Sequence, residues 1–393
     1  MGGMARRATK INEVRDQGIS VVVLEGGGFT GPEDELGELK FETLLVAFQQ
    51  MRYDAIGIGI SEILMLTDGH GAWEKLRSSR LPLSTLNLSY NGLLLADKPL
   101  IIQRDEIKVA VFSLFLEEKI PEGPAKYWQV IDPEQVITDA LQYARKNSDF
   151  IIALLYGTKT EVEQFVARHR GMDIVIDAMN RQPAFRPLTV NTSLILSAGE
   201  GGKYLGKIDA QHGDAGWAFE ARLVALTKSV AEDERLKDTY YAYLKRIREL
   251  MREQEEDLVK LSQTGLPPMP IAEDCSGCHE EIYNKWKETR HARAMLSLIN
   301  KKEDYNPECL PCHAVAYREG GFISLARTPE YAGVQCVSCH GNMQDHMEYH
   351  DGLLDEETFR PQEVTEAICL YCHTDQRDDD FVYARDKKQV HND

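Results

Sequence analysis

Long apolar runs are missing from this sequence of 393 residues. A transmembrane helix needs about 20 consecutive apolar residues, and no stretch approaches that length. The apolar run at 21–24 is also far too short to form the core of a secretion signal. We therefore expect no membrane-spanning segment, and no leader within the chain as written.

An excess of basic residues is missing as well. Lys and Arg number 45 against 63 for Asp and Glu, so the formal net charge is −18. Nucleic-acid binding requires a positive stripe that contacts phosphates, and no part of the chain offers one. The acidic balance excludes nucleic acid as a partner. It favours redox proteins as partners, or minerals and metal ions as extracellular electron acceptors. The acidic run 378–380 is expected to be a solvated tail segment.

Cysteine is absent outside one short motif. All eight cysteines occur in C-x-x-C-H pentads. The pentads are Cys275-Ser-Gly-Cys278-His279, Cys309-Leu-Pro-Cys312-His313, Cys336-Val-Ser-Cys339-His340 and Cys369-Leu-Tyr-Cys372-His373. This motif attaches c-type haem, because its two thiols form thioethers to the porphyrin and its histidine lies under the iron as the proximal ligand. The sequence therefore predicts four c-type haems.

Other uses of these cysteines fit the pattern less well. A zinc site would need Cys and His sets that converge on one tetrahedral centre, which does not explain a histidine directly after each pair. A disulfide within a C-x-x-C pair closes almost no loop and ignores the same histidine. The zinc, redox-dithiol and disulfide alternatives therefore rank behind covalent haem attachment.

Histidines outside the pentads are candidates for the second axial ligand of each iron. Of the 11 histidines in the chain, four lie in pentads. The others beyond residue 265 are His291, His346, His350 and His391. Four haems and four spare histidines predict bis-histidine iron throughout. Methionine is the competing ligand, since Met295, Met343 and Met347 lie nearby and would raise the reduction potential.

Two stretches near the pentads carry a family resemblance. Trp286 is followed by Arg290-His291-Ala292-Arg293-Ala294-Met295, and Gly333-Val334-Gln335 leads into the third pentad, with His346 six residues after it. Both are similar to segments of the tetrahaem cytochrome c family of hydroxylamine-oxidising nitrifiers, and the resemblance covers 270–375. It implies closely stacked haems whose distal histidines often come from the motif of another haem. We therefore expect His346 to serve the first haem.

The first 210 residues alternate short apolar runs with amphipathic stretches. The apolar runs that indicate buried strands are 20–24, 55–58, 109–115, 150–155 and 174–176. Amphipathic stretches at 133–145 and 161–170 indicate helices between them. The alternation predicts a layered α/β domain. The haem-binding part should instead have short helices and much irregular chain around the porphyrins.

Three segments of this α/β region are similar to the metallophosphoesterase domain of 5′-nucleotidases. They are Gly2-Gly3-Met4-Ala5-Arg6-Arg7-Ala8-Thr9, Tyr53-Asp54-Ala55-Ile56-Gly57-Ile58-Gly59 and Ala198-Gly199-Glu200-Gly201-Gly202-Lys203-Tyr204-Leu205-Gly206. The resemblance implies a layered sandwich fold and, in active members, two metal ions that activate water against a phosphate ester.

The metal ligands of that family are missing here. Its D-x-G-D becomes Glu25-Gly26-Gly27-Gly28, its G-N-H-E becomes Gly59-Ile60-Ser61-Glu62, and its G-H-x-H becomes Ala178-Met179-Asn180-Arg181. The position of its strand-end histidine is Tyr156, or Gly157 if the alignment shifts by one residue. Because glycine, isoleucine and methionine offer no hard oxygen or nitrogen ligands, we predict a pseudo-enzyme without phosphoesterase activity.

The chain is expected to contain a degenerate phosphoesterase domain at 1–215, a helical linker at 216–270 and a tetrahaem domain at 271–393. The linker should hold a long amphipathic helix over 232–263, which ends where Gly265 and a run of prolines follow. Its apolar face predicts packing onto a domain rather than onto a membrane surface.

Electron transfer is the favoured function, in the periplasm or outside the cell. The alternative is a multihaem oxidoreductase that acts on a small nitrogen or sulfur compound at an open haem. His346 and His350 lie four residues apart, so on a helix they share one face and could serve two irons. His391 could reach the haem of a neighbouring subunit, and head-to-tail donation in trans would build a homopolymeric filament.

Overall fold

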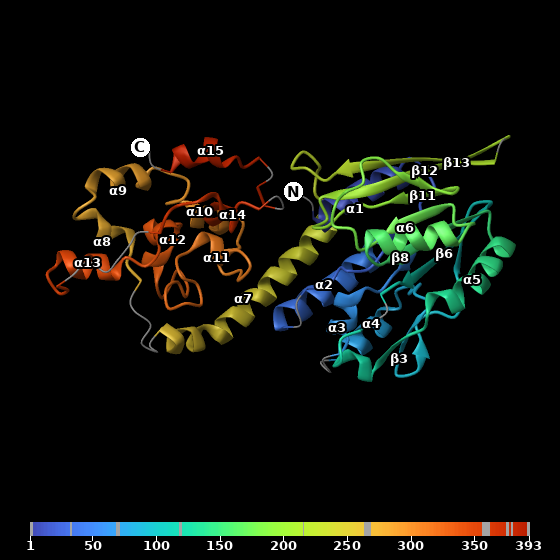
Figure 1. Ribbon diagram of the computed structural model, residues 1–393, viewed down its shortest axis with the longest axis horizontal. Helices are drawn as coiled ribbons and strands as arrows, with labels where there is room; N and C mark the ends of the chain where they lie inside the picture. The colour runs from blue at the N-terminus through green and yellow to red at the C-terminus, as the bar shows by residue number, and fades with distance from the viewer. Residues whose placement is uncertain are drawn as a thin grey trace. The chain divides into compact units, whose positions relative to one another are not determined.

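The computed structural model describes residues 3–31, 34–67, 71–117, 120–214, 216–262, 269–355, 362–374, 377–378 and 380–390 (Figure 1). The chain forms two compact units, Met1–Tyr243 and Leu244–Asp393. We call them unit 1 and unit 2 and describe each by itself. Within the described residues, no helix is both long enough and apolar enough to cross a membrane.

The centre of unit 1 is a six-stranded sheet in the order β10-β11-β9-β8-β6-β5. The strands are β5 (Leu100–Arg104), β6 (Ile107–Phe115), β8 (Phe150–Tyr156), β9 (Ile174–Asp177), β10 (Leu188–Val190) and β11 (Ser193–Leu196). The inner strands β6, β8, β9 and β11 run parallel, and the edge strands β5 and β10 pair antiparallel with their neighbours. Every residue of β8 is buried, as expected for a strand covered on both faces.

Two helices cover one face of this sheet. They are α5 (Pro133–Asn147) and α6 (Lys159–Arg168), each of which begins with a side-chain cap, from Asp132 and Thr158 respectively. Their apolar faces pack with Phe112, Leu114 and Leu155 of the sheet in the largest buried cluster of unit 1. The predicted alternation of buried strands and amphipathic helices is confirmed here.

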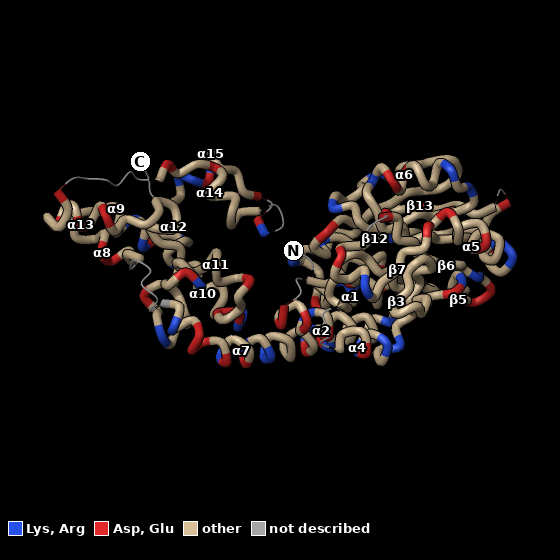
Figure 2. The backbone as a smooth tube through the Cα atoms, turned by 60° about the horizontal axis from the view of Figure 1, so that its bottom comes forward, with Lys and Arg blue, Asp and Glu red and all other residues tan. Residues whose placement is uncertain are grey.

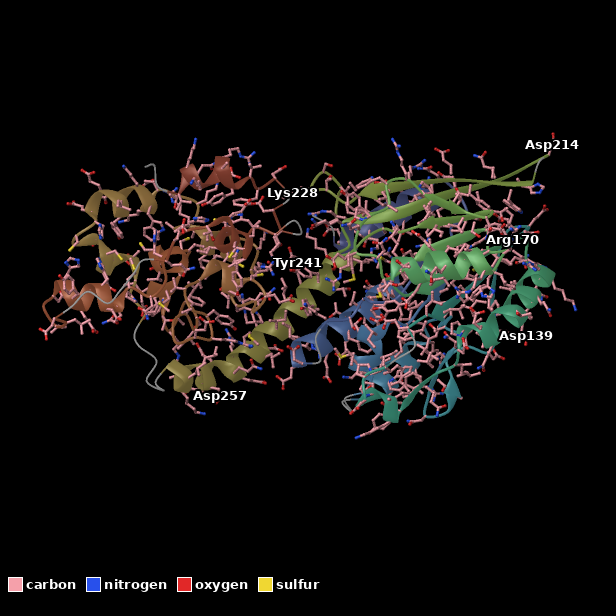
Figure 3. The ribbon with its side chains drawn as sticks, viewed as in Figure 1. Asp139, Arg170, Asp214, Lys228, Tyr241 and Asp257 are labelled. Atoms are coloured by element: carbon pink, nitrogen blue, oxygen red, sulfur yellow. The ribbon has the colours of Figure 1, made fainter. Side chains whose placement is uncertain are left out.

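A long hairpin and an N-terminal layer lie at the other face. The hairpin is β12 (Tyr204–Gly213) paired with β13 (Gly216–Ala225), and Asp214 lies at its tip (Figure 3). The N-terminal layer consists of α1 (Met4–Arg15), β1 (Leu24–Glu25), α2 (Glu35–Met51), β2 (Ala55–Ile56), α3 (Ile60–Met65) and α4 (Ala72–Ser79). Ile208 and Phe219 of the hairpin, together with Leu24, pack against the central sheet.

The strand expected at 20–24 is much shorter in the structure. Only Leu24 and Glu25 form a regular strand, parallel to β2. A small sheet in the order β4-β3-β7 completes unit 1 and consists of β4 (Leu93–Leu94), β3 (Leu88–Tyr90) and β7 (Trp128–Val130). A single turn, η1 (Pro124–Lys126), precedes β7.

The helix α7 (Glu234–Ser262) begins in unit 1 and continues into unit 2. Acidic and basic residues are mixed along it (Figure 2). The expected linker 216–270 therefore contains strand β13 before its helix begins. Apolar residues in the first half of α7, such as Leu236, Leu244 and Ile247, are buried, so this half of the helix packs against protein.

Unit 2 consists of short helices joined by irregular chain. They are α8 (Ala272–Ser276), α9 (Glu280–Lys287), α10 (Ala294–Ile299), α11 (Leu310–His313), η2 (Pro329–Tyr331), α12 (Cys336–His340), α13 (Gln344–His350), α14 (Glu366–Leu370), α15 (Tyr383–Asp386) and η3 (Lys387–Gln389). Its buried hydrophobic cluster contains six residues, among them Met295, Leu310 and Phe322. The predicted combination of an α/β domain with a mostly helical, irregular second part is confirmed.

Candidate functional site

Each pentad of unit 2 lies on or beside a short helix, namely α8, α11, α12 and α14. In the first pentad the backbone N–H of His279 donates to the carbonyl of Cys275 at 2.9 Å, and His373 makes the same bond to Cys369 at 2.9 Å. One helical turn therefore carries the first cysteine and the histidine of a pentad on the same face. This local geometry lets two thiols and one imidazole address a single flat ligand.

The fold brings the pentads together in two pairs. The thiol of Cys275 lies against that of Cys336, and the hydrogen bond between them lowers the pKa of Cys336 to about 7 and raises that of Cys275. A second bond of this kind joins Cys312 and Cys372 and lowers the pKa of Cys312 to about 6. None of the eight cysteines, all within the described residues, forms a disulfide. The first pentad is thus a neighbour of the third, and the second of the fourth.

Two histidines from outside the pentads face pentad histidines. The ring centroids of His279 and His346 are 6.4 Å apart with 21° between the ring planes. Those of His291 and His373 are 6.0 Å apart with 53° between the planes. Two imidazoles that ligate one metal ion from opposite sides, at about 2 Å per bond, have centroids roughly 6 Å apart. Both pairs have the spacing that a bis-histidine iron requires.

Hydrogen bonds fix the orientation of two pentad imidazoles. Nδ1 of His373 lies 2.6 Å from a carboxylate oxygen of Asp378, and the ring stacks on Phe381 with centroids 4.5 Å apart. Nδ1 of His313 lies 2.9 Å from the carbonyl oxygen of Ala294. An Nδ1–H that donates to such an acceptor leaves Nε2 as the metal-binding nitrogen. No sequence signal indicated the contact of Asp378, which was expected to lie in a solvated tail.

The remaining candidate ligands are placed differently. His350 lies at the end of α13. Its ring is edge-on to that of His346, and the two ring centroids are 4.6 Å apart. His391 lies outside the described residues. Met295 is 4% exposed within the hydrophobic cluster of unit 2, so its thioether has a packing role. Burial lowers the pKa of His291, which favours the neutral imidazole that binds metals.

In unit 1, the loops after β1, β2 and β8 meet at one edge of the fold. Glu62 on α3 is fully buried there. Its carboxylate accepts hydrogen bonds from the backbone N–H groups of Gly28 at 2.7 Å, Phe29 at 2.8 Å, Thr30 at 2.9 Å and Gly59 at 2.9 Å. Converging N–H groups of this kind form an anion-binding nest. The chain therefore fills its own nest with an internal carboxylate, a role of Glu62 that the sequence analysis missed.

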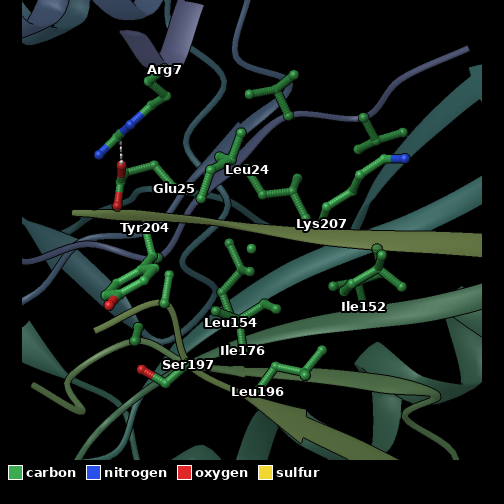
Figure 4. Close-up of a pocket in the computed structure, with 18 of the residues that line it drawn as sticks. Arg7, Leu24, Glu25, Ile152, Leu154, Ile176, Leu196, Ser197, Tyr204 and Lys207 are labelled. Carbon is green, nitrogen blue, oxygen red and sulfur yellow. Dashed lines mark hydrogen bonds and ion pairs between the residues drawn. The ribbon is translucent and has the colours of Figure 1, made fainter. Parts of the chain in front are cut away.

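Tyr156 lies beside Glu62, and Arg7 lies beside Glu25 (Figure 4). A Cβ atom at Gly59 would come within 2.2 Å of the Tyr156 ring, so the ring lies directly over that glycine. Burial raises the pKa of Tyr156 to about 12. Arg7 donates to Glu25 at 3.2 Å and to the Tyr53 hydroxyl at 2.9 Å. Among the residues that the structure describes, no three His, Cys, Asp or Glu side chains converge as a metal site requires.

Comparison with known proteins identifies two regions of similarity. The family model "Cytochrome c554 and c-prime" matches residues 274–341. Cytochrome c-554 of Nitrosomonas europaea is 32% identical over 90 residues, which cover 19% of this chain and 38% of that protein. Snake venom 5′-nucleotidase of Crotalus adamanteus is 22% identical over 264 residues, which cover 60% of this chain and 45% of that protein. The chain thus spans less than half the length of either relative.

Solved structures extend the second similarity to the fold. A sulfate thiohydrolase, SoxB, from Thermus thermophilus superposes with a TM-score of 0.56 at 19% identity over 63% of this chain and 47% of that one. A 5′-nucleotidase precursor from the same species gives a TM-score of 0.54 at 15% identity over 64% of this chain and 54% of that one. The N-terminal region therefore has the α/β fold of 5′-nucleotidase-like proteins, and the C-terminal region is similar to cytochrome c554.

Proposed function

We propose that this protein transfers electrons through four c-type haems attached to unit 2. Each haem would be held by the cysteines of one pentad, with His279, His313, His340 and His373 as the proximal ligands. The similarity of residues 274–341 to cytochrome c554 supports a multihaem electron carrier. When bound, such haems accept and release single electrons.

The observation that carries this proposal is the spacing of two imidazole pairs. The ring of His346 lies opposite that of His279, with centroids 6.4 Å apart, and the ring of His291 lies opposite that of His373, with centroids 6.0 Å apart. We assign these pairs as the axial ligands of the first and fourth haems. His350 and His391 are the candidates for the second and third. An iron with two histidines has no vacant position, so full pairing favours a carrier over an enzyme.

The neighbouring pentads support a path for electrons between the proposed haem sites. Cys275 contacts Cys336 and Cys312 contacts Cys372, so the attachment points of different haems lie side by side. Short distances between sites favour electron exchange within unit 2. The partners would be redox proteins or extracellular electron acceptors, and the location would be the periplasm or the cell exterior.

Low-temperature EPR of the oxidised protein, with and without cyanide, tests this function. We expect only low-spin signals that do not change when cyanide is added, because every iron has two protein ligands. A high-spin signal that shifts with cyanide would show an open iron. That result would contradict the carrier and favour an oxidoreductase that acts on a small nitrogen or sulfur compound.

Unit 1 is proposed to be a pseudo-enzyme that serves as a scaffold or docking module. Glu62 fills the anion nest and the ring of Tyr156 covers Gly59, so side chains of the protein itself occupy the nest and the position beside it. We expect no hydrolysis of adenosine monophosphate or p-nitrophenyl phosphate above background with added Mn²⁺ or Mg²⁺. Turnover that is lost on chelation and restored by metal would refute this assignment.

A further inference from the structure

The chain that follows the fourth pentad folds back onto the histidine of that pentad. The N–H groups of Arg377 and Asp378 both donate to the carbonyl oxygen of Thr374, at 2.9 Å and 2.8 Å. These bonds bring a carboxylate oxygen of Asp378 within 2.6 Å of Nδ1 of His373. The carboxylate therefore approaches the imidazole at the nitrogen that is not used for metal binding.

Contacts on two sides hold this arrangement in place. The ring of Phe381 stacks on that of His373, with centroids 4.5 Å apart and 18° between the ring planes. The guanidinium of Arg377 donates to the carbonyl oxygen of Glu308 at 3.2 Å and contacts Sγ of Cys312 at 3.6 Å. The segment that carries the carboxylate is thus attached both to the imidazole and to the chain around the second pentad.

The histidine of the second pentad offers a comparison within the same unit. Nδ1 of His313 lies 2.9 Å from the carbonyl oxygen of Ala294 and 3.4 Å from the hydroxyl of Ser297, and both neighbours are neutral groups. The neighbour of His373 is a carboxylate, and hydrogen bonds to carboxylates are stronger than those to carbonyl groups. A stronger acceptor at Nδ1 makes the imidazole a more basic metal ligand.

We propose that Asp378 is a positioning residue that lowers the reduction potential of the haem attached at Cys369 and Cys372. The inference rests on the proposed function, in which His373 is the proximal ligand of that haem. A more basic ligand and a nearby negative charge both favour ferric over ferrous iron. The step is the uptake of one electron by the iron, and the Nδ1 proton stays between His373 and Asp378 throughout.

This difference affects electron exchange between neighbouring sites. The second and fourth pentads lie side by side, because Cys312 contacts Cys372. With neutral acceptors at His313 and a carboxylate at His373, an electron shared by these two haems is shifted towards the second one. The fourth haem then acts as the donor of the pair.

Redox titration of the intact tetrahaem protein, followed by optical spectra, tests the proposal. Asp378→Asn keeps the shape of the side chain and an oxygen acceptor but removes the charge. We expect one of the four one-electron steps to become at least about tenfold more favourable, a rise of about 59 mV, and the other three to change less. Asp378→Glu keeps a carboxylate and should shift that step less than Asp378→Asn does.

Two further variants separate an effect through His373 from the mere loss of a charge. Asp380→Asn removes the same charge from an exposed residue two positions away, and it should change every step by less than about threefold. Asp378→Asn combined with Cys369→Ser and Cys372→Ser should leave the three remaining steps where they are in the double serine variant. Low-spin spectra check that the remaining histidine ligands stay on iron in each variant.

Three results would overturn the proposal. They are unchanged potentials in Asp378→Asn, a shift of the same size in Asp380→Asn or Asp378→Glu, and a shift that persists when the fourth haem is absent. Each of them leaves the electron-transfer proposal intact, because it is measured on attached haems that are reduced and oxidised. That proposal fails separately if mass spectrometry of the parent protein finds no covalent haem at Cys369 and Cys372.

Discussion

Protein made without haem should lose the folded structure of unit 2 and keep that of unit 1. The buried cluster of unit 2 has six residues, whereas the largest cluster of unit 1 is formed by two helices and several strands. Large apolar side chains of unit 2 stay exposed, including Ile282 at 45%, Leu296 at 52% and Tyr371 at 70%. So small a core cannot offset the conformational entropy of ordering unit 2.

The experiment compares the haem protein with a variant in which all eight pentad cysteines are serine. Thermolysin should cut the serine variant rapidly within 271–390 and leave a resistant fragment that contains 3–243. A matched variant, Cys369→Ser with Cys372→Ser, should retain three haems and most of its protease resistance. A haem-free unit 2 that resists thermolysin as the holoprotein does would show that its polypeptide folds by itself.

Removal of a distal histidine should convert one haem in four from low spin to high spin. His346→Ala is expected to affect the haem whose proximal ligand is His279, and His291→Ala the haem of His373, because these rings face one another at 6.4 Å and 6.0 Å. Each variant should gain a high-spin EPR signal and a cyanide-sensitive optical band from one haem. His212→Ala in unit 1, where the ring packs on Trp217, is the matched control and should change nothing.

Alanine variants of the two remaining candidate ligands, His350 and His391, test each of them separately. His350→Ala should open an iron if His350 serves a haem of its own, and it should leave the spectra unchanged if the residue only packs against His346. His391→Ala should open an iron and reduce the particle size if this residue is donated to a neighbouring subunit. Unchanged haem spectra and particle size in His391→Ala would eliminate ligation in trans and the filament based on it.

Much of this site could be predicted because its chemistry is local. A pentad places two thiols and an imidazole within one helical turn, so the sequence alone is enough to predict four attachment sites. The assignment of His346 to the first haem rested on family resemblance, and the position of its ring beside His279 supports it. The contact of Asp378 with His373 could not be predicted, because a run of acidic residues carries no sign that one carboxylate will contact an imidazole.

The sequence by itself determined the buried strands, the amphipathic helices and the pentads, since each depends on residue type and spacing along a few turns or strands. The tertiary structure alone decided which pentads are neighbours, which imidazoles face each other and how Glu62 fills the nest. These features join residues far apart in the chain, and their contacts depend on how whole elements pack, which short-range patterns do not encode.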